Sequence, residues 1–222
     1  KRFVADASHE LRTPLTSIQG NVDFLLQLDH PDAELQKETL ADISSETRRL
    51  NRLVKELLTL AKADSGVSLN FQEVELSALL DEVVRQARFL AQGQNFHPVL
   101  DEAEGVVLRV DPDYFKQMLY IFLDNGFKYT PPGKNFFFKV ARQENEVTLI
   151  FQDEGPGIPE KDLPHIFERF YRSETSRTGE GAGLGLAIAQ WIIEAHGGKL
   201  RVESEENKGT TFFITLSILS LF

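Results

Sequence analysis

The chain has 222 residues, a formal net charge of −10 and no cysteine. Its negative charge disfavours nucleic acid or an anionic membrane as the main partner, because both bind basic patches. The lack of cysteine excludes disulfides and thiolate metal sites, and a hydrophobic content of 41% suffices for a core. No apolar run of about 18 residues occurs, so we expect no membrane contact from this chain. It begins in mid-pattern at "KRFVADAS" without a methionine, which indicates a fragment of a longer protein.

Residues 1–66 have the pattern of two helices joined by a turn, with Asp32 as the expected N-cap of the second helix and Gly66 as its terminal glycine. Apolar residues recur at helical spacing in both helices. They are Val4, Leu11, Leu15, Ile18, Val22 and Leu25, then Leu40, Ile43, Leu50, Leu53, Val54, Leu57, Leu58 and Ala61. A lone hairpin cannot bury such a stripe. We predict a dimeric four-helix bundle, and the alternative is that the stripe packs on the rest of the chain.

Residues 67–222 alternate between strand-like and helical patterns. Several strand-like runs are adjacent in the sequence, which favours hairpins. We therefore predict an α/β two-layer sandwich with a mixed, largely antiparallel sheet and helices on one face. Strands are expected at 69–76, 105–110, 135–142, 146–153, 198–205 and 209–218, and helices at 77–92, 112–129 and 183–198. The polar, glycine-rich residues 173–183 are expected to form a mobile loop.

The stretch "ASHELRTPLT" contains a candidate reactive histidine, His9. On a helical wheel His9 lies opposite the apolar stripe, so it is expected to be exposed. Glu10 is its neighbour, Thr13 shares its face, and Pro14 removes a backbone donor from that turn. A metal site is disfavoured because no second histidine is nearby. Considered alone, His9 and Glu10 fit ordinary surface residues as well as they fit a reactive site.

Three motifs in the second region suit a nucleotide. "DEGPGIP", residues 153–159, follows a strand pattern, and its first residue could accept a hydrogen bond from the amine of adenine. "GAGLGLA", residues 181–187, opens a helix whose free N–H groups suit phosphate oxygens. "DNGFKYT", residues 124–130, combines an amide, a lysine and an aromatic ring. The glycine spacing fits neither the Rossmann nor the P-loop motif, and each motif alone is a weak signal.

In combination, these motifs make the chain resemble the sensor histidine kinases of two-component systems over nearly its whole length. "FVADASHELRTPLTSIQG" resembles the phosphoacceptor box, and "QMLYIFLDNGFKYTPPG" the N box. "DEGPGIP", "IFERFYR" and "GEGAGLGLAIAQWIIEAHGG" resemble the first glycine box, the F box and the second glycine box. The resemblance implies a dimerisation and histidine-phosphotransfer domain at 1–66. It implies an ATP-binding domain of the histidine-kinase and gyrase type at 67–222.

The resemblance also implies roles for residues on the helical hairpin. His9 would accept the γ-phosphoryl group of ATP through a ring nitrogen. Glu10 would act as base or orient the ring, since a neutral imidazole is what attacks. Thr13 would position water for dephosphorylating the partner regulator.

In the ATP-binding domain the resemblance implies a nucleotide site with Mg²⁺. Asn125 would ligate Mg²⁺, Lys128 would contact phosphates, Tyr129 would pack on adenine, and Asp153 would bind its amino group. The remaining nucleotide contacts would come from Gly155, Gly157, Arg172, Gly181, Gly183, Leu184 and Gly185.

One position departs from the family's pattern. The N box usually has a second asparagine one turn before the metal ligand, and here that position is Ile121. Losing one polar contact to a charged group costs about 1.5–3 kcal/mol, or roughly ten- to hundredfold in affinity or rate. The next residue after Asn125, usually alanine, is Gly126, which costs about 0.5–1 kcal/mol of helix stability. We therefore expect weakened rather than absent use of ATP.

The favoured function is an ATP-dependent protein-histidine kinase. It would be a homodimer that autophosphorylates His9 and passes the phosphoryl group to an aspartate on a response-regulator receiver domain, and regulator phosphatase activity is compatible with Thr13. A degenerate kinase, acting mainly as a phosphatase or regulator-binding module, is the alternative that Ile121 favours. A superfamily ATPase without phosphohistidine is the third. We expect the fragment to be cytoplasmic, and the resemblance is compatible with a membrane anchor in an N-terminal sensor region outside it.

Overall fold

A computed structural model describes residues 2–28, 32–66, 68–173 and 181–219. The chain folds into two compact units. The first comprises residues 1–67 together with 169–185, and the second comprises residues 68–168 and 186–222. The end of the F box and the start of the second glycine box therefore group with the helical hairpin.

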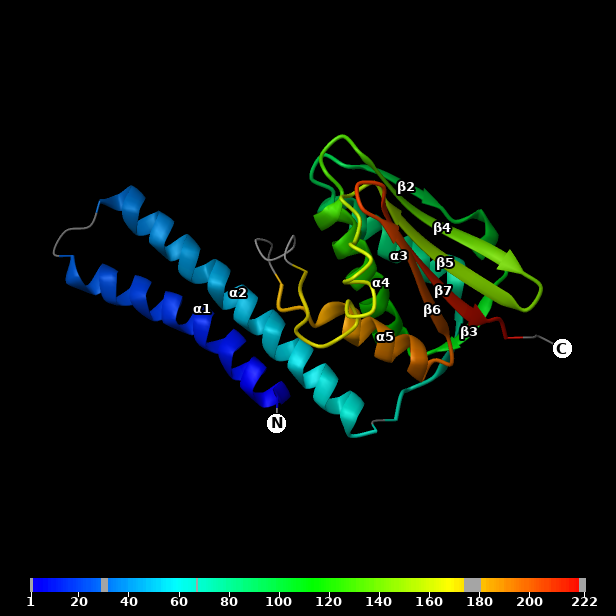
Figure 1. Cartoon of the computed structure of the whole chain (residues 1–222), viewed down its shortest axis with the longest axis horizontal. Coiled ribbons are helices and arrows are strands. Elements are labelled where there is room, and N and C mark those ends of the chain that lie inside the picture. The colour runs from blue at the N-terminus through cyan, green and yellow to red at the C-terminus, as the bar shows by residue number, and fades with distance from the viewer. Residues whose placement is uncertain (1, 29–31, 67, 174–180, 220–222) are drawn as a thin grey trace. The chain divides into compact units, whose positions relative to one another are not determined.

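The first unit is built on the hairpin of α1 (Arg2–Gln27) and α2 (Ala33–Asp64), seen in Figure 1. α1 continues through Pro14 without a break. Asp32 stands at the N-cap of α2 but its side chain makes no capping hydrogen bond, and Gly66 follows the helix with φ +68°. Much of the apolar stripe remains exposed within one chain. Val4, Leu15, Leu40 and Leu58 are 67%, 57%, 51% and 57% exposed.

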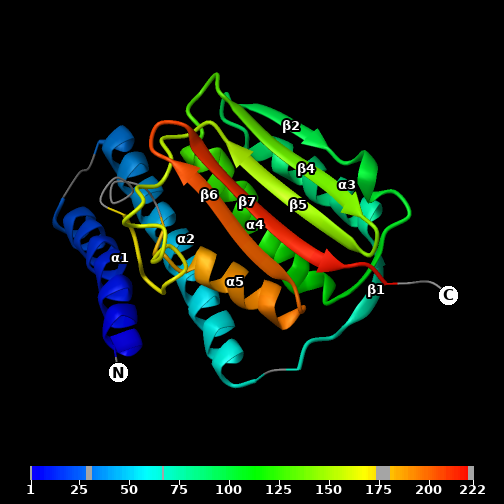
Figure 2. The ribbon, with the colours of Figure 1, turned by 45° about the vertical axis from the view of Figure 1, so that its right-hand side comes forward.

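The second unit is built on a five-stranded sheet with the order β2-β4-β5-β7-β6 (Figure 2). Its strands are β2 (Asn95–Val99), β4 (Asn135–Gln143), β5 (Glu146–Asp153), β7 (Gly209–Ser217) and β6 (Lys199–Glu205). Only β2 runs parallel to its neighbour, β4, and the other pairs are antiparallel. β1 (Gln72–Glu75) and β3 (Val107–Val110) form a separate antiparallel pair. Two 3₁₀ turns, η1 (Arg88–Leu90) and η2 (Asp101–Ala103), complete the described elements before α4.

Three helices, α3 (Leu76–Ala87), α4 (Pro112–Tyr129) and α5 (Gly185–Ala195), cover one face of this sheet (Figure 2). The predicted two-layer sandwich with a mixed, largely antiparallel sheet is therefore confirmed. Alternate residues of the central strands point inward, and the core between sheet and helices is rich in phenylalanine. The fully buried rings are those of Phe115, Phe122, Phe136, Phe138 and Phe151.

The expected helix 112–129 and strand 146–153 coincide with α4 and β5. Asp111 explains the sharp start of α4, because its carboxylate accepts hydrogen bonds from the backbone N–H groups of Asp113 and Tyr114. β2 was not among the expected strands, because it is short, polar and interrupted by Pro98, which only an edge strand tolerates. Most of the expected loop at 173–183 falls at residues 174–180, outside the described residues. No helix in the described part of the chain has the length and apolar character needed to cross a membrane.

Candidate active site

His9 lies on the solvent-exposed side of α1 in the first unit, as the helical wheel predicted. Thr13 is exposed on the same face, and its hydroxyl donates a hydrogen bond of 3.3 Å to the His9 carbonyl oxygen. Glu10 is half-buried beside them. The imidazole is therefore open to solvent, while the adjacent residue is partly shielded from water.

The Glu10 side chain borders a small polar pocket within the first unit. Arg48, Arg49 and Arg52 of α2 line it together with Gly181 and Ala182 of the glycine-rich stretch. Arg49 forms an ion pair of 3.6 Å with Glu46 of the same helix. Residues from the second glycine box thus lie next to the turn of α1 that contains the phosphoacceptor motif.

Asp153 ends β5 in the second unit and is the most constrained of the predicted site residues. Its Oδ1 accepts hydrogen bonds from the backbone N–H groups of Gly155 (2.8 Å) and Thr210 (3.2 Å). Among the described residues, no group donates to its Oδ2. Burial raises the pKa of this carboxyl above its ordinary value, and the two backbone hydrogen bonds partly offset that rise. One oxygen is thus fixed in place, and the other is available to accept a hydrogen bond from a ligand.

The turn after Asp153 requires its glycines. A Cβ on Gly155 would lie 2.6 Å from the carbonyl oxygen of Tyr129, and one on Gly157 would lie 2.1 Å from that of Glu205. Gly157 also has φ +70°. The first glycine box is therefore packed directly against the end of α4 and the β6–β7 hairpin.

The last two turns of α4 place the N-box residues at the edge of the same unit. Asn125 is half-buried, and Lys128 and Tyr129 are exposed, with the Lys128 ammonium 5.1 Å from the Tyr129 ring centroid. Ile121, one turn before Asn125, is half-buried. Because Tyr129 touches Gly155, the N box and the first glycine box are neighbours in space.

The structure explains Gly126, which the sequence marked only as a weak point of the helix. A Cβ at this position would lie 2.0 Å from Cζ of Phe136, which is fully buried on β4. The glycine leaves the space that the phenylalanine ring fills. The pairing could not be read from the sequence, because the two positions lie on different elements, with a turn among the nine residues between them.

Other predicted site residues belong to the first unit. Arg172, Gly181 and Gly183 are half-buried, Leu184 is fully buried, and Gly185 begins α5. Gly183 has φ +73°, and a Cβ on it would lie 2.6 Å from the carbonyl oxygen of Tyr171. The structure thus brings the F-box end and the second glycine box together.

Two hydrogen-bonded groups were not among the predicted site residues. Asn135 donates to Glu154 through its backbone N–H (2.9 Å) and its side-chain amide (3.1 Å), and its Oδ1 lies 3.0 Å from Nε2 of His97. These hydrogen bonds from Asn135 hold the pKa of the Glu154 carboxyl below its ordinary value. An asparagine at the start of a predicted strand was the only signal for these hydrogen bonds to Glu154 of the first glycine box.

The second group is centred on His196, at the end of α5. Its Nδ1 donates to the Ile192 carbonyl oxygen (2.7 Å), and its Nε2 accepts from the Asp111 backbone N–H (3.0 Å). Burial lowers the pKa of this imidazole below its ordinary value, so a neutral ring is favoured. Asp111 also accepts a hydrogen bond from the Asn70 backbone N–H, which ties the segment that precedes β1 to this junction.

Comparison with known proteins decides the family. Residues 1–66 match the model described as His Kinase A (phospho-acceptor) domain, and residues 110–219 match Histidine kinase-, DNA gyrase B-, and HSP90-like ATPase. The chain belongs to the sensor histidine kinase family. The chain is 38% identical over 219 residues to Sensor protein SrrB of Staphylococcus aureus, strain NCTC 8325 / PS 47, covering 97% of this chain and 38% of that relative. It therefore spans less than half the length of the curated relatives that it matches.

Solved structures agree with this assignment. The histidine kinase AdeS of Acinetobacter baumannii is 26% identical with a TM-score of 0.73, over 96% of this chain and 98% of AdeS. The histidine kinase ThkA, solved in complex with the response regulator protein TrrA, is 26% identical with a TM-score of 0.77. That match covers 98% of this chain and 61% of ThkA.

Proposed function

We propose that this chain is the catalytic part of an ATP-dependent protein-histidine kinase, which autophosphorylates His9 and passes the phosphoryl group to an aspartate of a response regulator. The observation that carries the proposal is the exposed His9 beside the half-buried Glu10, in a chain that also contains the hydrogen-bonded turn at Asp153. A phosphoacceptor and an adenine-binding group are the two requirements of such a kinase.

The adenine would bind at Asp153. Gly155 and Thr210 hold Oδ1, so Oδ2 is oriented to accept a hydrogen bond from the exocyclic amine. Tyr129, 36% exposed at the end of α4, would pack on the base, and Lys128 would contact phosphates. Phosphoryl transfer depends mainly on positioning and charge neutralisation, which these residues would supply.

The expected Mg²⁺ suits Asn125. In the described residues, no group of three or more His, Cys, Asp or Glu side chains is placed to hold a metal ion. Mg²⁺ commonly binds one or two protein oxygens together with substrate phosphates and water, so one amide oxygen from Asn125 is sufficient. The ion would neutralise phosphate charge during transfer.

In the transfer step, the lone pair of a neutral His9 ring nitrogen forms a bond to the γ-phosphorus while the bond to the bridging oxygen breaks, and ADP leaves. Glu10 would accept the proton from the other ring nitrogen or orient the ring by a hydrogen bond. Its half-buried position strengthens that interaction relative to open water. Thr13, on the same face, would later position water for dephosphorylation of the regulator.

The partners follow from the hairpin. Its exposed apolar side chains, which include Val4, Leu15, Leu40 and Leu58, favour a second copy of the chain as the bundle partner. ThkA was solved with a response regulator, which favours a receiver domain as the phosphoryl acceptor. Ile121 favours the second candidate function, a kinase with impaired ATP use that acts mainly as a regulator phosphatase or binding module.

The test is incubation of the chain with Mg²⁺ and ATP labelled in the γ-phosphate. We expect acid-labile label on the wild type and on a matched control, His165→Gln, and none on His9→Gln. If only Ile121→Asn takes up label, the degenerate alternative holds. ATP hydrolysis without phosphoprotein in any variant would indicate an ATPase of the same superfamily.

A further inference from the structure

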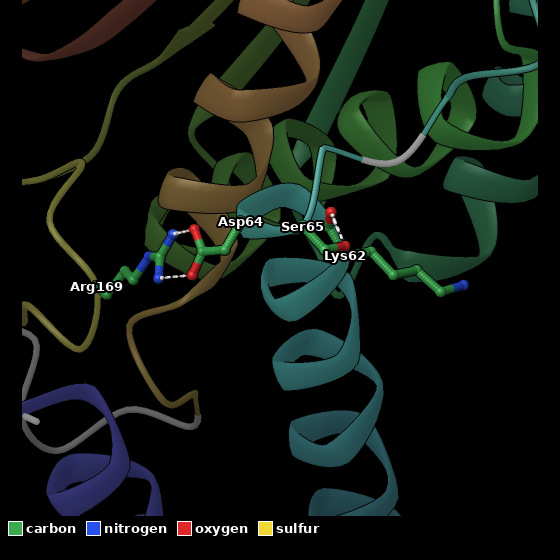
Figure 3. Close-up of polar contacts among 4 residues, drawn as sticks. All are labelled: Lys62, Asp64, Ser65 and Arg169. Carbon is green, nitrogen blue, oxygen red and sulfur yellow. Dashed lines mark hydrogen bonds and ion pairs between the residues drawn. The ribbon is translucent and has the colours of Figure 1, made fainter.

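Within the first unit, Arg169 makes a two-pronged ion pair with Asp64 in the last turn of α2 (Figure 3). Its Nη1 donates to Oδ2 of Asp64 at 2.8 Å, and its Nη2 donates to Oδ1 at 2.6 Å. The pair joins positions 105 residues apart in the sequence. The Arg169 hydrogen bonds lower the pKa of Asp64, and those to Asp64 raise the pKa of Arg169. The planar fork of arginine fits a carboxylate in this geometry.

The same stretch also contacts the first turn of α1. The Arg169 guanidinium lies 5.2 Å from the ring centroid of Phe3, within the range of a cation–π contact. The Phe170 ring lies 5.8 Å from that of Phe3. Two successive residues therefore hold the start of α1 and the end of α2 together.

Phe170 closes this contact in an unusual conformation. Its φ is +64°, a region that bulky L-residues rarely adopt. Its backbone N–H donates to the carbonyl oxygen of Gly183 at 2.9 Å, which fixes the turn. Such strain persists only where surrounding contacts impose it. The arrangement is therefore held closed by contacts whose loss would relax it.

We propose that Phe3, Asp64, Arg169 and Phe170 form a clasp that holds residues 169–173 and 181–185 on the hairpin and slows autophosphorylation. The proposal rests on the proposed function, under which Arg172 and the second glycine box contact ATP. Arg172 and the start of the second glycine box belong to the same compact unit as the hairpin, and the clasp contacts hold them there. Because the clasp spans both helices, a displacement of the first turn of α1 relative to Asp64 opens it.

A charge swap in the full chain tests the clasp. Asp64→Arg and Arg169→Asp each place two like charges together, and the double variant restores an opposite pair. Hydrogen exchange at residues 169–173 reports the contact without nucleotide, and single-turnover labelling at saturating ATP reports the rate. We expect each single variant to lose protection and to label about two- to fivefold faster, the range for an exposed ion pair. The double variant restores both readouts.

Lys62→Glu is the matched control, since Lys62 lies in the same turn of α2 but points away from Arg169 (Figure 3). It changes the charge of that turn by two without touching the clasp, and should leave exchange and rate unchanged. Phe3→Ala should mimic the single variants, while Phe3→Tyr keeps the ring and should not.

Unchanged protection in both single variants, or no recovery in the double variant, would overturn the clasp. Slower labelling in the single variants, recovered in the double, would overturn its inhibitory role and make Arg169 a positioning residue. If no variant takes up label, the proposed function fails, but exchange still decides the clasp: lost and recovered protection supports it.

Discussion

Gly126→Ala tests the packing of the second unit, because this glycine makes room for a ring. A Cβ on Gly126 would lie 2.0, 2.2 and 2.5 Å from three carbons of the Phe136 ring. The ring cannot easily move aside. It is fully buried, and the rings of Phe96 and Phe127 pack on it at centroid distances of 5.6 and 5.1 Å.

Two opposing effects set the change in the free energy of unfolding. Adding a methyl group to a filled core costs about 1–3 kcal/mol. Replacing glycine by alanine inside a helix returns roughly 0.5–1 kcal/mol. Because three ring atoms are closer than any real contact allows, the steric cost lies at the upper end of its range. We expect the free energy of unfolding to fall by about 2–2.5 kcal/mol, which lowers the melting temperature by about 4–10 °C for a unit of this size.

Urea unfolding followed by tryptophan fluorescence measures this directly. Trp191 is the only tryptophan of the chain, and it lies on α5 in the second unit. Gly20→Ala is the matched control, because a Cβ on Gly20 meets nothing within 4 Å. Its unfolding is followed by circular dichroism. Phe136→Leu should rescue Gly126→Ala, so that the double variant loses less than the sum. An increase in stability on Gly126→Ala, or additive losses, would refute the packing argument.

Three further predictions concern the site. Asp153→Asn keeps one oxygen that can accept from the two backbone N–H groups. It also removes a carboxylate whose pKa is raised by burial, so the free energy of unfolding at pH 7 should not fall. Calorimetric affinity for ATP should nevertheless drop at least about tenfold, and a parallel loss of both would point to misfolding. Ile121→Asn should raise Mg-ATP affinity or the labelling rate about ten- to hundredfold, and no change would mean that this position does not contact the nucleotide. Burial lowers the pKa of His196 in the folded chain below the ordinary value of 6.5. As the pH falls, the imidazole is therefore protonated at a higher pH in the unfolded chain than in the folded chain. The free energy of unfolding should therefore fall as pH drops below about 6.5, and His196→Gln should flatten that part of the urea-unfolding profile against pH.

The sequence predicted the layers of the fold well, because α4 and β5 have strong periodicity and clear ends. Asp111 caps α4, which begins at Pro112 as the helical pattern predicted. β2 was missed because pairing with β4, not local preference, makes it a strand. Exposure of His9 followed from helix geometry alone.

Contacts between distant segments could not be predicted. Nothing in the sequence indicates that Gly126 faces Phe136 or that Arg169 meets Asp64. The strained backbone of Phe170 is likewise imposed by its surroundings, since no local preference favours a positive φ at phenylalanine. Motifs thus identified the residues of the site, while the contacts that hold them in place required the fold.

The most direct test of the central claim is the location of the phosphoryl group after incubation with Mg²⁺ and ATP. Peptide mapping of the wild-type chain by mass spectrometry at neutral pH, where phosphohistidine survives, identifies the modified residue. We predict an acid-labile phosphoryl group on the peptide that contains His9, with the other four histidines unmodified. Phosphate on a different histidine, or only acid-stable phosphate, would contradict the assignment of His9 as the phosphoacceptor.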